Sequence, residues 1–132
     1  MGLSNKGSLE GTAIHNWYTR QHEAGEARGR PFSEPPKYER YMEEVGFVDI
    51  HVKTIKWPMG DWMEEARNKE IGKWNITNQI EVVKSVSRAT RAEGRTEEED
   101  EAELANITRE VRDPDLHLYM PLYIVWGRKP LD

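Results

Sequence analysis

Two side chains near the start of the sequence have types that could carry acid–base chemistry. His15 and Tyr18 fall in the segment GTAIHNWYTRQHEAGEARG, whose apolar spacing predicts a helix with both residues on one side. Histidine titrates near neutral pH and a tyrosine hydroxyl donates hydrogen bonds, so the pair could serve as an acid or a hydrogen-bond donor at a pocket wall. They are the candidate catalytic residues, and the alternative is that His15 is an ordinary surface histidine.

A metal site is not expected. His15 and His22 are seven residues apart, which separates them by about 10 Å along a helix, too far to share an ion. The chain has no cysteine, which excludes disulfides, thiolate zinc sites and a cysteine nucleophile. There is no HExxH motif and no Ser-His-Asp order, and we interpret His51 and His117 as structural.

Aromatic and sulfur-containing side chains favour the binding of a hydrophobic small molecule. Five tryptophans, five tyrosines and five methionines supply large and adaptable apolar surface. Trp17, Tyr41 and Trp126 have the spacing of core residues and are expected to pack. The candidate substrate-binding residues lie at a strand exit and on the helix that follows it: Trp57, Met59, Trp62, Trp74, Asn75 and Asn78.

Two helices are predicted in the first third of the chain. The first has Thr12 as its N-cap and ends at Gly29, because its apolar residues recur at helical spacing between these two signals. The second covers KYERYMEEVG, about three turns, and ends at Gly46. The loop RPFSEPP separates them.

A strand and a long helix are predicted in the middle of the chain. Apolar and polar residues alternate from Val48, but the apolar phase changes before Trp57, which indicates a bulge near Thr54 or burial of both faces. Asp61 is the predicted N-cap of a helix that runs to Thr90, with Gly72 as a possible break.

The last third predicts a helix and a strand. Thr96 and Glu99 have the spacing of a capping box, which starts a helix that runs to about Arg112. The segment from Leu116 to Trp126 is apolar on both faces except for Pro121, as expected of a strand inside a sheet.

Length and composition limit the class of protein. The 132 residues predict a single domain over residues 1–132, because that length supports one modest core. No apolar run approaches about 18 residues, so no membrane partner is expected and the cytoplasm is the default location. The net charge of -5 argues against nucleic acid as a partner, since affinity for phosphates comes from Lys and Arg.

The order of these elements resembles the C-terminal third of SAM-dependent methyltransferases of fungal secondary metabolism, which have a class I, Rossmann-like fold. The resemblance covers nearly the whole chain, and its most specific segments are GFVDIHVKTIKWPMG and PLYIVWGRKP. In such enzymes the last two strands form an antiparallel edge pair, and helices cover the substrate. The resemblance therefore implies an α+β fold, an antiparallel hairpin covered by four or five helices.

The resemblance also implies that the cofactor-binding half is missing from this chain. A nucleoside cofactor requires a glycine-rich loop directly after a strand. Gly2, Gly7 and Gly11 have a different spacing and follow no predicted strand. We therefore expect no cofactor and no methylation by this chain alone.

A homodimer is the predicted assembly. In the resembling enzymes, the strand equivalent to Leu116–Trp126 pairs on its far side with a strand that this chain is expected to lack. Such an edge has to be covered. Two copies pairing these strands across a twofold axis would form a four-stranded sheet.

Three functions are compatible with these expectations. The preferred hypothesis is a non-methylating biosynthetic enzyme of the cyclase or pericyclase type, which folds a hydrophobic substrate into a reactive shape. The first alternative is an accessory subunit or truncated C-terminal fragment of a methyltransferase. The second alternative is a non-catalytic binding protein.

Overall fold

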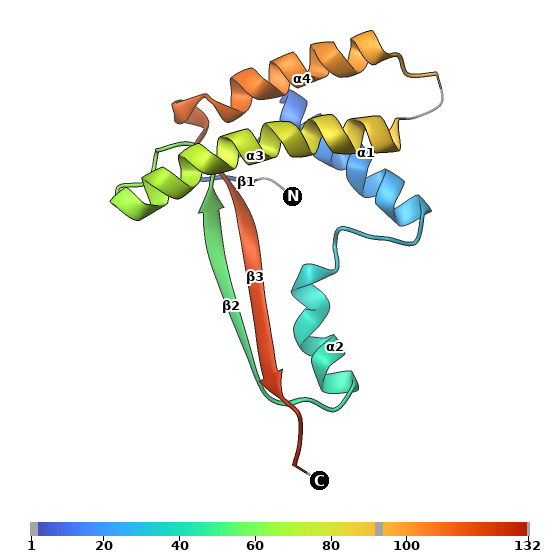
Figure 1. Cartoon of the computed structure of the whole chain (residues 1–132), viewed down its shortest axis with the longest axis vertical. Helices are drawn as coiled ribbons and strands as arrows, with labels where there is room; N and C mark the ends of the chain where they lie inside the picture. Colours follow the sequence, from blue (N-terminus) through green and yellow to red (C-terminus); the bar gives the residue numbers. More distant parts are fainter. Residues whose placement is uncertain (1–2, 92–93, 132) are drawn as a thin grey trace.

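The computed structural model describes residues 3–91 and 94–131 (Figure 1). Its elements are β1 (Leu3–Ser4), α1 (Ala13–Ala27), α2 (Tyr38–Glu44), β2 (Val48–Pro58), α3 (Ala66–Thr90), α4 (Glu97–Val111) and β3 (Leu118–Arg128), with short 3₁₀ turns at Pro35–Lys37 and Pro114–Leu116. The fold is α+β, as expected. Residues 1, 2, 92, 93 and 132 of the predicted single domain lie outside the described residues, and so the prediction for the glycine at position 2 does too.

The sheet is antiparallel and has the order β1-β3-β2. β2 and β3 pair along nearly their whole length, which confirms the predicted edge pair. β1 adds a short third strand, because Leu3 and Ser4 pair with Tyr119 and Leu118. The chain therefore supplies two residues of a strand on the far side of β3, where none was expected.

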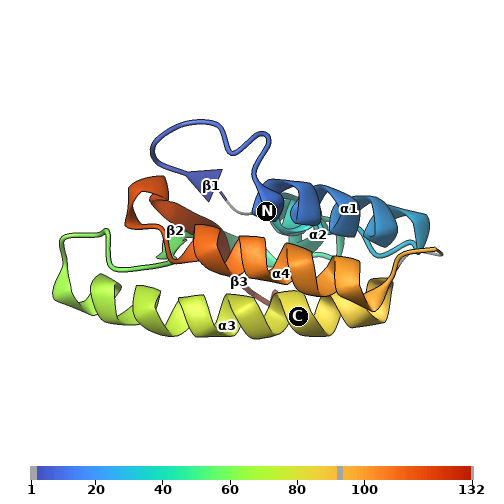
Figure 2. The same ribbon diagram turned by 90° about the horizontal axis from the view of Figure 1, so that it is seen from above.

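Three helices form a layer across one end of the hairpin (Figure 1). α3 and α4 run side by side, and α1 packs against α4 (Figure 2). The start of β2 and the end of β3 form the half of the hairpin that projects from this layer, and α2 lies beside it. The buried core lies where the helices meet the end of β2 and the start of β3: Leu9, Ile14, Trp17, Met59, Val83, Ile107, Val111 and Leu118.

Thr12 is the N-cap of α1, as predicted, and the Thr12 hydroxyl oxygen accepts from the backbone N–H of His15. A second acceptor comes from α4. The two carboxylate oxygens of Glu110 accept from the backbone N–H groups of Ala13 and Ile14, each at 2.8 Å. A carboxylate at the positive end of a helix dipole is favourable, so Glu110 joins α4 to the start of α1.

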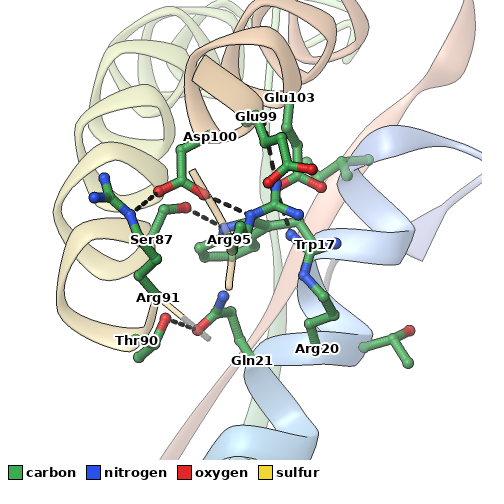
Figure 3. A network of polar contacts seen from close by, with 12 residues as sticks. Trp17, Arg20, Gln21, Ser87, Thr90, Arg91, Arg95, Glu99, Asp100 and Glu103 are labelled. Carbon is green, nitrogen blue, oxygen red and sulfur yellow. Dashed lines mark hydrogen bonds and ion pairs between the residues drawn. The ribbon is translucent and has the colours of Figure 1, made fainter. Parts of the chain in front are cut away.

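A polar network joins α1, α3 and α4 at the other end of the layer (Figure 3). The indole N–H of Trp17 donates to Ser87 Oγ at 2.7 Å. Asp100 accepts from Arg91 and Arg95 at 2.7 and 2.6 Å. Burial alone would raise the pKa of Asp100, but these hydrogen bonds and charges outweigh it and lower the pKa below its usual value.

α4 starts with the predicted capping box, in which Thr96 Oγ1 accepts from the Glu99 N–H and the Glu99 carboxylate accepts from the Thr96 N–H. The second predicted helix was too long. Pro35–Lys37 forms a 3₁₀ turn, and α2 covers only Tyr38–Glu44. Gly46, with a φ of 91°, ends it as predicted.

Neither explanation predicted for the change of apolar phase is correct: there is no bulge near Thr54, and the two faces are not buried, since Val52 and Ile55 are 42% and 40% exposed. Pairing between β2 and β3 is regular from His51 to Pro58, and the irregularity lies between Val48 and His51, where Asp49 has a φ of 51°. The change of apolar phase has a simpler cause. Val52 pairs with Val125 on one face, whereas Ile55 pairs with Leu122 on the other, so both faces of the hairpin are apolar.

α3 and β3 both start later in the sequence than predicted. α3 begins at Ala66, with Glu65 rather than Asp61 at its N-cap. β3 begins at Leu118 because Pro114–Leu116 forms a 3₁₀ turn and His117 takes a left-handed conformation with a φ of 46°. The indole N–H of Trp62 donates to the Leu118 carbonyl at 2.8 Å. This hydrogen bond joins the segment that precedes α3 to the first residue of β3.

Gly72 does not break α3, which is continuous from Ala66 to Thr90. Its role is a close approach between backbones. The Gly60 N–H donates to the Gly72 carbonyl at 3.0 Å, and a Cβ at Gly72 would lie 1.8 Å from the Gly60 carbonyl oxygen. Only glycine allows α3 to lie this close to the turn that follows β2.

We predict that Gly72→Ala destabilises the protein. Alanine would favour a helix by about 1 kcal/mol, but the methyl group collides with backbone that cannot rotate away, and such overpacking costs about 1–3 kcal/mol. Urea unfolding followed by circular dichroism should show a net loss. The exposed Lys69→Ala on the same helix is the control and should change stability by less than about 0.5 kcal/mol. Equal or higher stability of Gly72→Ala would contradict the close approach.

Candidate functional site

An open hollow of about 450 Å³ lies where α3 crosses the end of β2. β2 contributes Trp57, and one stripe of α3 contributes the other lining residues: Arg67, Glu70, Ile71, Trp74, Asn75 and Asn78. These α3 positions have the spacing i, i+3, i+4, i+7, i+8 and i+11, so they follow one face of the helix. Four of the six predicted substrate-binding residues, Trp57, Trp74, Asn75 and Asn78, thus meet in one place.

The structure places Met59 and Trp62 elsewhere. Met59 is 2% exposed in the core, and its N–H donates to the Leu118 carbonyl. Trp62 stacks on His117 with ring centres 4.9 Å apart, and it also lies against Tyr119. Its hydrogen bond to Leu118 makes it an anchor between the turn after β2 and the start of β3.

The walls of the hollow suit a flat apolar molecule. Trp74 is 73% exposed, and Trp57 is half-buried. Within the described part of the chain, neither indole N–H forms a hydrogen bond, so both remain available to a ligand. The charged pair Arg67 and Glu70 has opposite signs and lies at one end of the stripe, so this end carries no formal net charge.

A chain of hydrogen bonds forms the polar end of the hollow. Asn75, which is 2% exposed, donates from Nδ2 to the Pro58 carbonyl at 2.9 Å. Its Oδ1 accepts from Asn78 Nδ2 and from Gln79 Nε2, each at 3.4 Å. Gln79 Oε1 in turn accepts from the Tyr18 hydroxyl at 3.1 Å.

The Pro58 carbonyl sets the direction of this chain. A carbonyl oxygen can only accept, so Asn75 has to turn its amide nitrogen toward it and its oxygen toward Asn78 and Gln79. Gln79 must then present its nitrogen to Asn75 and its oxygen to Tyr18. Each amide along the chain therefore has one consistent orientation.

The two candidate catalytic residues differ in their surroundings. Burial raises the pKa of Tyr18 from 10.0 to about 12, so the hydroxyl stays protonated as the donor that Gln79 requires. It reaches the hollow only through Gln79 and Asn75. His15 is half-exposed on the first turn of α1, and among the described residues its ring makes no hydrogen bond and no stacking contact with the chain of amides.

Gln79 is the site residue that sequence reasoning missed. It is 3% exposed and lies one turn after Asn75, among the apolar residues Ile76, Ile80 and Val83. A polar residue on the apolar face of a helix is the signal that could have identified it. Arg67, Glu70 and Ile71 were missed because they share only the helical stripe of Trp74 and Asn78.

Across residues 3–91 and 94–131, no group of three or more His, Cys, Asp or Glu side chains is arranged to hold a metal ion. Within the same residues, no helix combines the length and the apolar character needed to cross a bilayer.

Comparison with known proteins shows what the chain is related to. It is 33% identical over 130 residues to the probable methyltransferase tdiE of Emericella nidulans, a match that covers 96% of this chain and 41% of that protein. The secondary metabolism regulator laeA of Monascus pilosus is 30% identical over 94% of this chain and 35% of its own length. The methyltransferase pytC of Aspergillus terreus is 28% identical over 81% of this chain and 34% of its own length.

The homologues of this chain are fungal methyltransferases of secondary metabolism. The resemblance proposed from the sequence is thereby confirmed. The chain spans about two fifths of tdiE and about a third of laeA and pytC. No family model matches the chain, and no solved structure matches it.

The raised pKa of Tyr18 gives a testable pH dependence. A group whose pKa is higher in the folded state stabilises the fold below the unfolded value, here 10.0, and that contribution is lost as pH rises toward about 12. Each unit corresponds to about 1.4 kcal/mol. Tyrosinate absorbance of the protein minus that of Tyr18→Phe should show a group that ionises near pH 12. Tyr123→Phe, on the projecting part of the hairpin, is the control. If the tyrosine that is lost in Tyr18→Phe ionises near 10.0 instead, the burial of the Tyr18 hydroxyl is contradicted.

Proposed function

We propose that this chain is the substrate-side part of a methyltransferase fold, which binds a hydrophobic small molecule in the hollow and is completed by a strand that lies outside these 132 residues. The observation that carries this proposal is the free edge of β3. β1 pairs only with Leu118 and Tyr119, so the rest of the strand has no neighbour on that side among the described residues.

The apolar faces of the hairpin support the same proposal. Leu122 and Ile124 are each 40% exposed, and Trp126 is 49% exposed. They lie on the face that also carries Ile55 and Trp57, so the exposed apolar surface continues directly into the hollow. An apolar strand with an open edge is a typical site for the addition of another strand.

We place the SAM site outside these 132 residues as well. Gly7 and Gly11 do follow a strand, β1, which corrects the expectation from the sequence. However, the N–H groups at the start of α1 that could receive an anionic ligand are already bound to the Glu110 carboxylate. This supports a chain that binds no cofactor at this loop.

A cofactor-independent enzyme of the cyclase type is the second candidate. The observation in its favour is the fixed orientation of Asn75 beside two indole rings, since cyclisations depend mainly on a preorganised surface that holds the substrate in one shape. In that case Tyr18 is a positioning residue rather than the acid, because its hydroxyl is bound to Gln79.

The oligomeric state distinguishes these proposals from the homodimer predicted by the sequence. We expect the 132-residue chain alone to sediment as a monomer at micromolar concentration. Ile124→Lys should then change its stability by less than about 1 kcal/mol, because the side chain is already exposed. The core substitution Val83→Lys is the contrasting variant and should prevent folding. A dimer that Ile124→Lys dissociates would contradict a strand supplied from outside these 132 residues and favour β3 pairing across a twofold axis.

A further inference from the structure

The orientation of Asn78 carries information about the ligand. The Asn78 amide nitrogen faces Asn75 Oδ1, and this atom is fixed as the oxygen because Asn75 Nδ2 donates to the Pro58 carbonyl. Reversing the Asn78 amide would bring two carbonyl oxygens together. Its own Oδ1 is therefore not the atom that faces Asn75, and as Asn78 lines the hollow this oxygen can accept from a ligand there.

We infer that the hollow selects neutral, flat aromatic molecules that carry a hydrogen-bond donor, such as a phenolic hydroxyl. Asn78 Oδ1 accepts the hydrogen bond from this donor. This inference rests on the proposed binding of a hydrophobic small molecule in the same hollow. Trp57 and Trp74 would contact the ring, and Asn78 the hydroxyl.

The remaining lining residues support a neutral ligand. Arg67 and Glu70 lie three residues apart on α3 and carry opposite charges, so neither sign of ligand is favoured. From Arg67 to Asn78 the helix rises about 16 Å, which leaves room for two or three fused rings between the charged end and the amide end.

The consequence is a distinction between a hydroxyl and its methyl ether. A phenol can donate to Asn78 Oδ1, whereas the corresponding ether has no proton and loses this hydrogen bond. The two molecules are otherwise nearly equal in shape. The hollow should therefore prefer the unmethylated member of such a pair, which is the direction expected if a methyl acceptor binds here.

The test compares 2-naphthol with 2-methoxynaphthalene. Each is titrated into the ¹⁵N-labelled 132-residue protein, and the indole N–H signals of Trp57 and Trp74 report binding in the hollow. We expect 2-naphthol to bind more tightly by about two- to tenfold, the range of one hydrogen bond. Asn78→Ala should remove this preference. Thr77→Ala, an exposed neighbour that does not line the hollow, should keep it.

The outcomes separate this inference from the proposed function. Equal affinities for the two probes with shifted indole signals would overturn the role of Asn78 and leave the small-molecule site standing. A preference that survives Asn78→Ala would also overturn it. Failure of both probes to shift either indole signal would overturn the proposed site and, with it, this inference. Asn78 is exposed, so its substitution leaves the core intact.

Discussion

The close approach of Gly60 and Gly72 is the contact on which the arrangement of the site depends. It brings the backbone of α3 against the turn that follows β2, with a hydrogen bond of 3.0 Å between them. One turn further along α3, Asn75 can then reach the Pro58 carbonyl. The same contact sets Trp57 of β2 beside the stripe that carries Trp74. Any larger residue at position 72 would push these groups apart.

Stability and binding surface are divided between two parts of the molecule. Within the described residues, the buried core and the ion pairs of Asp100 and Glu103 lie in the helical layer and at the adjoining ends of β2 and β3. The projecting half of the hairpin has apolar residues on both faces and little cover except α2. The helical layer can therefore hold the site, while the hairpin remains available to another strand.

Local signals in the sequence predicted the parts of the fold that depend on neighbouring residues. Thr12 and the Thr96–Glu99 capping box were correct because an N-cap is satisfied within one turn. The predicted starts of α3 and β3 were wrong: β3 starts late because a 3₁₀ turn and the left-handed His117 precede it, and the segment before α3 is joined to Leu118 by a long-range hydrogen bond from Trp62. Gly72 was interpreted as a break because its actual neighbour, Gly60, is brought to it only by the fold.

The same limit applies to the site. Trp57, Trp74, Asn75 and Asn78 were predicted together, since three of them share one helix and Trp57 precedes it. Gln79 and the link to Tyr18 were not predicted, because the fold alone brings Tyr18 of α1 within hydrogen-bond distance of Gln79 of α3. Trp62 looked equivalent to its neighbours in sequence, but the turn after β2 directs it to β3.

The most direct test of the account is amide hydrogen exchange along β3 in the 132-residue chain. The Leu118 carbonyl accepts from the Met59 N–H and so faces β2. Because the backbone groups of successive residues alternate in direction in an antiparallel ladder, the N–H groups of Leu122 and Ile124 also face β2. Tyr123 and Val125 face the free edge. The account predicts slow exchange at Leu122 and Ile124 and fast exchange at Tyr123 and Val125. Equal protection at all four residues would show that the edge is already covered and would contradict the need for a strand from outside these 132 residues.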